Sequence, residues 1–359
     1  MPDTDLIPTA DPLLGKLCVR LKKQPKRIVF SDGQDIRVIR CAARIVAMEI
    51  GVPILLGNKD KIEAMAAGEG VDMTFVSVVD PGKSSEIELF CKRLSKMARY
   101  RKKEVTDPGE LVTRPHNFAA MMVQYGHADA MIAGNASSPT AVFRAVISMI
   151  APLPHVPKIF GASVVSAPHL QHFGKDGVVF MADCGVIPKP GVKQLASIAV
   201  ETGKLALHLL GRTPRVAMLS HSTKGSAGTK QAGKIAAATH LARLQVREAQ
   251  LDIDVDGELQ ADVALDPAAA EVKLADSKFR NPADVLVFPN LDAGHIALKL
   301  LEHTAGAQNY GQLIMGLTRP AAQVSLTTSE EQLLGTAILV AAEAIKFNNL
   351  HLEQETGES

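Results

Sequence analysis

The stretch Arg215–Gly228, RVAMLSHSTKGSAG, decides how the rest of the chain is interpreted. Its apolar run Val216–Leu219 has the composition of a β-strand and leads into a loop of small polar residues. A helical pattern then runs from Thr229 to about Leu244. In such a loop, backbone N–H groups and the positive end of a helix converge, which suits a phosphate or pyrophosphate. An ordinary strand-to-helix turn with a helix cap explains these residues as well, and they alone leave both interpretations open.

The same alternation of strands and helices extends outward through the whole chain. Strands of about five residues are expected at 27–31, 52–56, 75–79, 128–133, 159–165, 178–183, 216–219, 285–288 and 312–317. Helices are expected at 11–23, 35–49, 59–67, 84–99, 117–125, 192–210, 229–244, 267–275, 295–302 and 329–346, with another starting at residue 140. This rhythm is typical of βαβ units, so it predicts an α/β fold with mostly parallel sheets.

The length and composition predict a two-domain globular protein of the cytosol. A chain of 359 residues exceeds the usual size of one domain, and the proline-rich passage 151–157 is the best candidate boundary. The net charge of +1 gives no global reason to expect nucleic acid or an anionic membrane as a partner. The four cysteines lie far apart, which argues against a disulfide framework or a zinc site. No apolar run reaches the roughly 20 residues of a membrane span, and the acidic N-terminus is unlike a signal peptide.

A second loop of small residues, Gly134–Pro139, follows the strand expected at 128–133 and also precedes a helix. Arg144 lies on the first turns of that helix, close enough to serve an anion held at its N-terminus. Ligands of open α/β sheets bind at the carboxyl ends of the strands. Two such loops, one in each expected half, therefore predict a cleft ligand that carries phosphates.

The dense basic patch at 92–103 offers further cations for such a ligand. Most of its lysines and arginines are expected on a solvated helix face and loop, although a guanidinium in a cleft is well suited to bind phosphate. The chain has no G-x-x-x-x-G-K-[ST] loop, no strand-coupled G-x-G-x-x-G, no G-x-S-x-G elbow and no H-E-x-x-H. A P-loop nucleotidase, a dinucleotide site, an α/β-hydrolase and a zinc protease are therefore not indicated.

Four blocks of the sequence together carry a resemblance to a known family. They are DAMIAG at 129–134, VAMLSHSTKG at 216–225, DGELQ at 256–260 followed by Asp262, and VFPNLDAG at 287–294. Their residues and order resemble the successive signature blocks of the phosphate acetyl/butyryltransferase (phosphotransacetylase) family. The similarity runs from about Arg27 to about Ile345, which is nearly the whole chain.

The resemblance implies an enzyme with two α/β domains, of the isocitrate/isopropylmalate dehydrogenase-like architecture, with the active site in the cleft between them. The first domain would comprise residues 1–155 plus 312–359, and the second residues 156–311. The implied reaction is reversible transfer of an acetyl or short acyl group between CoA and inorganic phosphate. CoA or acyl-CoA would be a substrate, with no metal and no tightly bound cofactor. A cytoplasmic homodimer acting on small molecules, without nucleic acid or membrane, is expected.

The resemblance also implies roles for individual residues of this chain. The catalytic set would include Arg101, Arg144 and Ser325, where the serine assists the acyl carbonyl and the arginines contact phosphate or CoA. The residues of the two small-residue loops would bind substrate: Ser137, Ser138, Ser222, Thr223, Lys224 and Gly225.

The C-terminal block departs from the family pattern at two positions. Leu326 stands where the family has an arginine that binds phosphate, and Gln332 stands where it has the aspartate that deprotonates the CoA thiol. A leucine cannot give an arginine's forked hydrogen bonds, and a glutamine cannot act as a general base. Glu331, or its neighbour Glu330, is the candidate substitute base. Glu331 also fits a capping box as the N3 residue of a helix whose N-cap is Thr328.

These departures leave three functional hypotheses. The first is an active phosphate acyltransferase. The second is a catalytically weakened homologue that binds acyl-CoA in a regulatory role. The third keeps acyl transfer but changes the acyl group, because Leu326 makes the pocket more apolar and could suit a longer chain.

Overall fold

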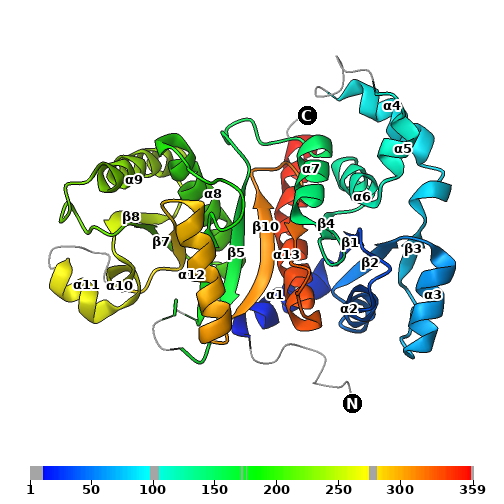
Figure 1. Ribbon diagram of the computed structural model, residues 1–359, viewed down its shortest axis with the longest axis horizontal. Helices are drawn as coiled ribbons and strands as arrows, with labels where there is room; N and C mark the ends of the chain where they lie inside the picture. Colours follow the sequence, from blue (N-terminus) through cyan, green and yellow to red (C-terminus); the bar gives the residue numbers. More distant parts are fainter. Residues whose placement is uncertain (1–10, 98–104, 171–172, 175, 275–280, 357–359) are drawn as a thin grey trace. The chain divides into compact units, whose positions relative to one another are not determined.

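The computed structural model describes residues 11–97, 105–170, 173–174, 176–274 and 281–356, with side chains as far as Lys346 (Figure 1). Internal contacts divide this chain into two compact units. Unit 1 comprises residues 14–152 and 317–356, and unit 2 comprises residues 11–13 and 153–316. The domain limits expected from the sequence stay a prediction, because a division by contacts does not test independent folding.

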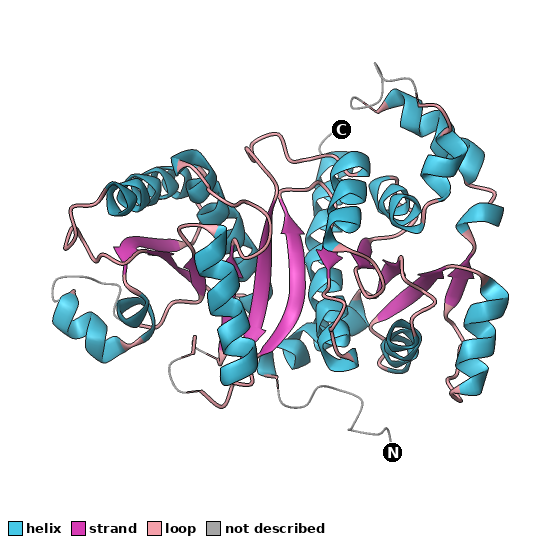
Figure 2. Ribbon diagram, in the orientation of Figure 1, coloured by secondary structure: helices cyan, strands magenta, loops and turns pink. Residues whose placement is uncertain are grey.

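The sheet of unit 1 is parallel throughout, with strand order β3-β2-β1-β4-β11. Its strands are β1 (Lys26–Phe30), β2 (Gly51–Leu56), β3 (Ser77–Val79), β4 (Ala130–Ala133) and β11 (Ala321–Gln323). Every residue of β4 and β11 is buried, as expected for parallel strands that have helices on both faces (Figure 2). The carboxyl ends of β1, β4 and β11 consequently lie side by side at one edge.

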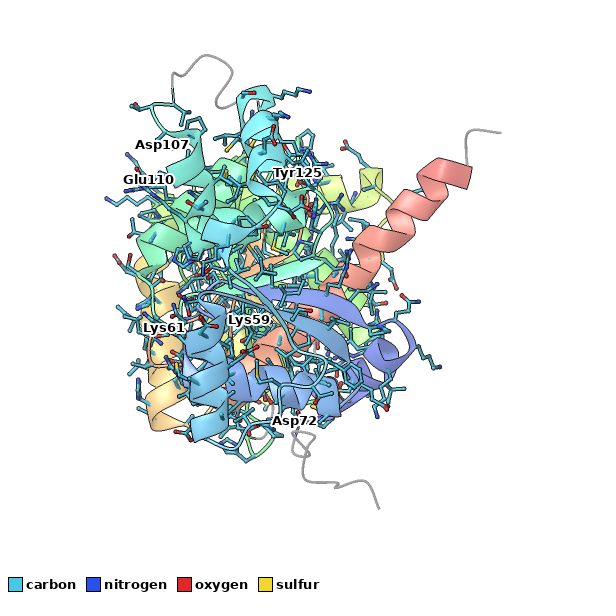
Figure 3. All side chains as sticks on the ribbon, turned by 90° about the vertical axis from the view of Figure 1, so that its right-hand side faces the viewer. Lys59, Lys61, Asp72, Asp107, Glu110 and Tyr125 are labelled. Carbon is cyan, nitrogen blue, oxygen red and sulfur yellow. The ribbon has the colours of Figure 1, made fainter. Side chains whose placement is uncertain are left out.

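Eight helices of unit 1 are described around this sheet. They are α1 (Pro12–Lys23), α2 (Ile36–Ala47), α3 (Lys59–Gly68), α4 (Ile87–Lys96), α5 (Pro108–Thr113), α6 (Pro115–Gln124), α7 (Pro139–Met149) and α13 (Glu330–Thr356). Polar side chains begin several of them: Asn58 caps α3 beside Lys59 and Lys61, and Asp107 caps α5 by accepting the Glu110 N–H at 2.8 Å (Figure 3). The apolar stretch of α13 is buried against β1, β4, β11 and α2.

The sheet of unit 2 is mixed, with strand order β10-β5-β6-β9-β7-β8. Its strands are β5 (Phe160–Ser166), β6 (Val178–Ala182), β7 (Arg215–Leu219), β8 (Asp254–Leu259), β9 (Val285–Val287) and β10 (Gln308–Met315). The pairs β10–β5 and β5–β6 are antiparallel, whereas β6–β9, β9–β7 and β7–β8 are parallel. The expectation of mostly parallel sheets therefore holds, and the antiparallel pairs are an addition to it.

Five helices of unit 2 are described: α8 (Val192–Leu210), α9 (Lys230–Glu248), α10 (Ala261–Leu265), α11 (Pro267–Lys273) and α12 (Leu291–Thr304). The start of α12 corrects the sequence-based boundary at His295, because the helix begins four residues earlier. The side chain of Asn290 accepts the Ala293 N–H at 3.0 Å and so caps the first turn of α12. The Pro, Asn, Asp and Gly residues of this segment had indicated a loop instead. Within the described part of the chain, no helix is long and apolar enough to cross a membrane.

Candidate active site

The first candidate site lies within unit 1, where the segments after β1, β4 and β11 meet. Gly134, directly after β4, has φ of +122°, and a Cβ atom there would lie 2.2 Å from the carbonyl oxygen of Val324. Only glycine fits this close approach. The Val324 N–H also donates to the Ala133 carbonyl at 2.9 Å. The Gly134–Pro139 loop and the segment that contains Ser325 are therefore neighbours, and we name their meeting point the unit 1 edge.

Asp32, which follows β1, holds the Gly134–Pro139 loop in place. Its carboxylate accepts the Gly134 N–H at 2.7 Å and the Ser137 hydroxyl at 2.7 Å. Ser138 meanwhile caps α7, since its side chain accepts the Ala141 N–H at 3.4 Å. Ser137 and Ser138 thus both have hydrogen-bond partners inside unit 1. Their roles in substrate binding stay predictions. Asp32 could not be recognised from the sequence, because nothing in its neighbourhood marks a carboxylate that binds this loop.

Arg37 joins both neighbouring segments through its guanidinium group. One nitrogen donates to the carbonyls of Leu326 and Thr328 at 2.9 and 2.8 Å, and another donates to the Asn135 carbonyl at 2.9 Å. The hydrogen bond to Asp35 raises the pKa of Arg37, so the group stays charged. Arg37 therefore fixes the backbone of the unit 1 edge, and it is a second residue that sequence patterns did not reveal.

Ser325 and Leu326 are both exposed at this edge. The Ser325 hydroxyl lies 3.0 Å from that of Thr327 and accepts the Thr327 N–H at 3.3 Å. The Leu326 side chain is 54% exposed, although its carbonyl is held by Arg37. An exposed hydroxyl next to an exposed apolar side chain can meet a polar carbonyl and an alkyl chain together.

The helix cap at the start of α13 differs from the predicted one. The N–H of Gln332 donates to the Ser329 hydroxyl at 3.2 Å, and the N–H of Ser329 donates to the Gln332 side chain at 3.0 Å. This is a capping box in which Ser329 is the N-cap and Gln332 is N3. The prediction of Thr328 and Glu331 was wrong by one residue, because the helix begins at Glu330. Gln332 therefore has a clear structural role.

Glu331 forms an ion pair with Arg44 of α2. Both guanidinium ends of Arg44 donate to its carboxylate, one of them at 3.2 Å, and Glu330 lies 3.5 Å from the same arginine. This carboxylate is thus already paired with a cation of the protein. A catalytic role for Glu331 stays a prediction.

The opening RVAMLSHSTKG stretch of unit 2 is held by the DGELQ block. Glu258 accepts the Ser222 hydroxyl at 3.1 Å and the Gly225 N–H at 2.6 Å. The ammonium group of Lys224 donates to the carboxylate of Asp256 and to the Gly257 carbonyl, the latter at 2.9 Å. The loop's donors are thus bound to protein carboxylates.

Thr223 completes this arrangement. Its hydroxyl lies 3.3 Å from the Gln260 side-chain oxygen and accepts the Gln260 N–H at 3.1 Å. The two sequence blocks that carried the resemblance therefore contact each other, and Ser222 and Thr223 are buried between them. Substrate binding by Ser222, Thr223, Lys224 and Gly225 stays a prediction.

A cavity of about 560 Å³ lies beside this loop, within unit 2. It sits at the carboxyl ends of β7 and β9 and at the first turns of α9 and α12, and its polar lining includes Lys189, Ser220, His221, Lys234 and Asn290. Burial lowers the pKa of Lys234, and its ammonium group donates to the carbonyls of Pro190 and Pro289 at 3.3 Å each. These partners are neutral carbonyls, so this amine can accept an anionic ligand.

Of the two arginines predicted to be catalytic, the structure describes only Arg144. Arg144 lies exposed on α7, and no ion pair joins it to another described residue. Arg101 lies outside the described residues. Among the described residues, no group of three or more His, Cys, Asp and Glu side chains is placed to hold a metal ion.

Comparison with known proteins identifies the family. Residues 13–341 match the family model described as phosphate acetyl/butaryl transferase. The chain belongs to this family. It is similar to a phosphate acetyltransferase of Acetivibrio thermocellus, with 33% identity over 92% of this chain and 98% of that one. The predicted family is therefore confirmed.

Two solved structures support the same assignment. The EutD phosphotransacetylase from Staphylococcus aureus is 31% identical, covers 92% of this chain and 98% of its own, and gives a TM-score of 0.84. A phosphotransacetylase from Streptococcus pyogenes is 29% identical, with 93% and 98% covered and a TM-score of 0.83. The predicted α/β fold class and the phosphate acyltransferase function are confirmed. The regulatory alternative is not supported over that function.

Proposed function

We propose that the acyl transfer between CoA and inorganic phosphate takes place at the unit 1 edge. The observation that carries this assignment is the joint anchoring of two loops by Arg37, which binds the carbonyls of Asn135, Leu326 and Thr328. Such anchoring keeps Ser325 in a fixed position relative to the Gly134–Pro139 loop. Fixed geometry of this kind lowers the entropic part of a reaction barrier.

In this reaction the thiolate sulfur of CoA attacks the carbonyl carbon of an acyl phosphate. The carbon–sulfur bond forms, the bond from carbon to the phosphate oxygen breaks, and phosphate leaves with the electron pair. The Ser325 hydroxyl, which is exposed at the edge, would donate to the carbonyl oxygen as negative charge develops on it. Arg144 supplies positive charge for the leaving phosphate, and Arg101 of the predicted set would act with it.

The cavity of unit 2 would bind phosphate groups of the CoA substrate. Lys189, Lys234 and His221 line it, and two helix N-termini open onto it. The cavity lining includes Ser220 and His221, which directly precede the loop. The loop residues would therefore act on substrate binding indirectly, by fixing the position of this lining: Ser222, Thr223, Lys224 and Gly225.

The acyl group can be larger than acetyl. The half-exposed side chain of Leu326 beside Ser325 supports a short apolar chain such as butyryl, because its contact with alkyl carbons would remove apolar surface from water. Comparing kcat/KM for acetyl phosphate and butyryl phosphate tests this selectivity. A preference for acetyl that Leu326→Ala leaves unchanged would exclude a role for this side chain.

We also propose an oligomeric state and a cellular location. The family resemblance implies a homodimer in the cytoplasm without a tightly bound cofactor. Light scattering of the purified protein tests the dimer, and mass spectrometry of the protein as purified tests for a retained cofactor.

The decisive assay uses purified protein with CoA and either acyl phosphate, followed by thioester formation. Turnover of about 1 per second or more is expected, within the usual range of enzymes. Turnover far below that value, with tight binding of acetyl-CoA, would instead support the regulatory hypothesis.

A further inference from the structure

Acyl transfer from an acyl phosphate needs a base, because the thiolate is the nucleophilic form of a thiol. The segment around Ser325 does not offer an unoccupied one. Gln332 carries an amide and caps α13. The carboxylates of Glu331 and Glu330 both lie beside Arg44, the first bound by it and the second 3.5 Å away. A base from another element of the unit 1 edge is therefore required.

His116 lies on such an element. It is the second residue of α6, which packs against β1, β4 and α7. The imidazole is half-buried, and its Nδ1 atom is buried without a hydrogen-bond partner among the described residues. α6 leads through residues 125–129 into β4 and packs against that strand, so the first residues of α6 lie at the carboxyl end of β4, which is part of the unit 1 edge. The negative charge of the Asp32 carboxylate, which holds the Gly134–Pro139 loop there, acts on the His116 ring.

Asn135 gives a second, independent sign that a ligand belongs at this edge. Its side chain is only 3% exposed, and its amide nitrogen is buried with no partner among the described residues. Most buried polar groups in proteins are hydrogen-bonded. Of the exceptions among the described residues, Asn135 lies in the loop that Asp32 holds and His116 lies on the neighbouring helix, and a bound substrate can supply the contact that the Asn135 amide lacks.

The surroundings of His116 suit a proton acceptor. Burial lowers the pKa of His116, and the negative charge of Asp32 partly opposes this shift. The ring is thus neutral near pH 7 and carries a lone pair, while a nearby carboxylate stabilises the imidazolium that forms after proton transfer.

We propose that His116 is the base that accepts the thiol proton of CoA, an inference that rests on the proposed function. The sulfur–hydrogen bond breaks, and the proton moves to Nε2, because Nδ1 is buried. The thiolate then attacks the acyl carbon and phosphate departs. In the opposite direction, the His116 imidazolium returns the proton to the CoA sulfur as phosphate takes the acyl group.

The test compares His116→Asn and His116→Gln with wild-type protein. Both variants are expected to lower kcat/KM for CoA by about 10²–10⁴-fold at pH 7, which is the usual effect of a general base. Added imidazole should restore part of the lost rate, which a purely structural role would not allow. His127→Asn is the matched control, since His127 lies just beyond the other end of α6, and it should keep near-wild-type activity.

The pH dependence of wild-type kcat/KM provides a measurement that needs no variant. Activity should be lost as the pH falls through a midpoint below about 6.5, the usual value for histidine. The proposal is wrong if the rate instead climbs tenfold per pH unit up to about 8.5, the ordinary pKa of a thiol. Full activity of a folded His116→Asn variant would also overturn it. Absence of turnover in wild-type protein would count against the proposed function itself.

Discussion

The unit 1 edge and the STKG loop of unit 2 use their polar groups in opposite ways. In unit 2, Ser222, Thr223 and Lys224 are all bound by side chains of the DGELQ block. At the unit 1 edge, the backbone is anchored, but Asn135 and His116 keep polar atoms without partners among the described residues. The strongest sequence motif is therefore internally paired, whereas the unpaired polar atoms of the unit 1 edge lie in segments with a weaker pattern.

Replacing Arg37 should give the largest effect. Arg37→Ala removes hydrogen bonds to three backbone carbonyls, so the free energy of unfolding should fall by about 3 kcal/mol. The loosened edge should also lower kcat by about 10²-fold. Thermal melts and steady-state kinetics measure both changes.

Arg40→Ala is the matched control on the same helix. Its exposed ion pair with Glu69 should contribute less than about 1 kcal/mol to stability. If Arg37→Ala behaves like this control, the unit 1 edge is not held as described.

Glu258→Ala should have the next largest effect, and in a different parameter. It removes the acceptor of the Ser222 hydroxyl and of the Gly225 N–H, which should lower stability by about 2 kcal/mol. Because the loop directly follows Ser220 and His221, which line the unit 2 cavity proposed to bind CoA, KM for CoA should rise while kcat stays similar. Glu258→Gln keeps an oxygen at the same place and should retain most of the stability. A fall in kcat alone would place the chemistry in unit 2.

Gln332→Ala should have a smaller effect, on stability rather than on rate. It removes one half of the capping box, at a cost of about 0.3–1.5 kcal/mol. Gln332→Glu preserves the cap, and urea unfolding should distinguish the two variants. If kcat instead falls strongly in Gln332→Ala while the free energy of unfolding hardly changes, this side chain contacts the substrate.

Glu331→Gln should have the smallest effect. The Arg44 pair is partly exposed, so its loss should change stability by less than about 1 kcal/mol. With His116 as the base, kcat/KM should fall less than tenfold. A fall of about 10²-fold or more would assign the base to Glu331.

Much of the fold was predictable because hydrophobic periodicity is a local property. The expected strands and helices correspond to most of the observed ones, including β7 and α9 around the opening stretch. The three-residue strand β11 and the antiparallel pairing of β5 were not predictable in the same way. A short strand carries almost no pattern, and the direction of pairing depends on partners far along the chain.

The site was predictable only as a set of loops. The sequence located Gly134–Pro139 and Ser222–Gly228, but it could not reveal that Asp32 binds a loop 102 residues away. Arg37 contacts the carbonyl of Leu326 across 289 residues. Such contacts between a side chain and a distant backbone leave no periodic signal. Charge alone also gave no means of distinguishing Arg37 from the many surface arginines.

One pair of identical substitutions tests the central claim most directly: Ser325→Ala at the unit 1 edge and Ser222→Ala in the unit 2 loop. Steady-state kinetics of both variants would be measured with CoA and an acyl phosphate. If Ser325 assists the acyl carbonyl as proposed, Ser325→Ala lowers kcat with little change in KM or stability. Ser222→Ala should lower stability and raise KM for CoA, with kcat nearly kept. The opposite result, a loss of kcat only in Ser222→Ala, would contradict the proposal.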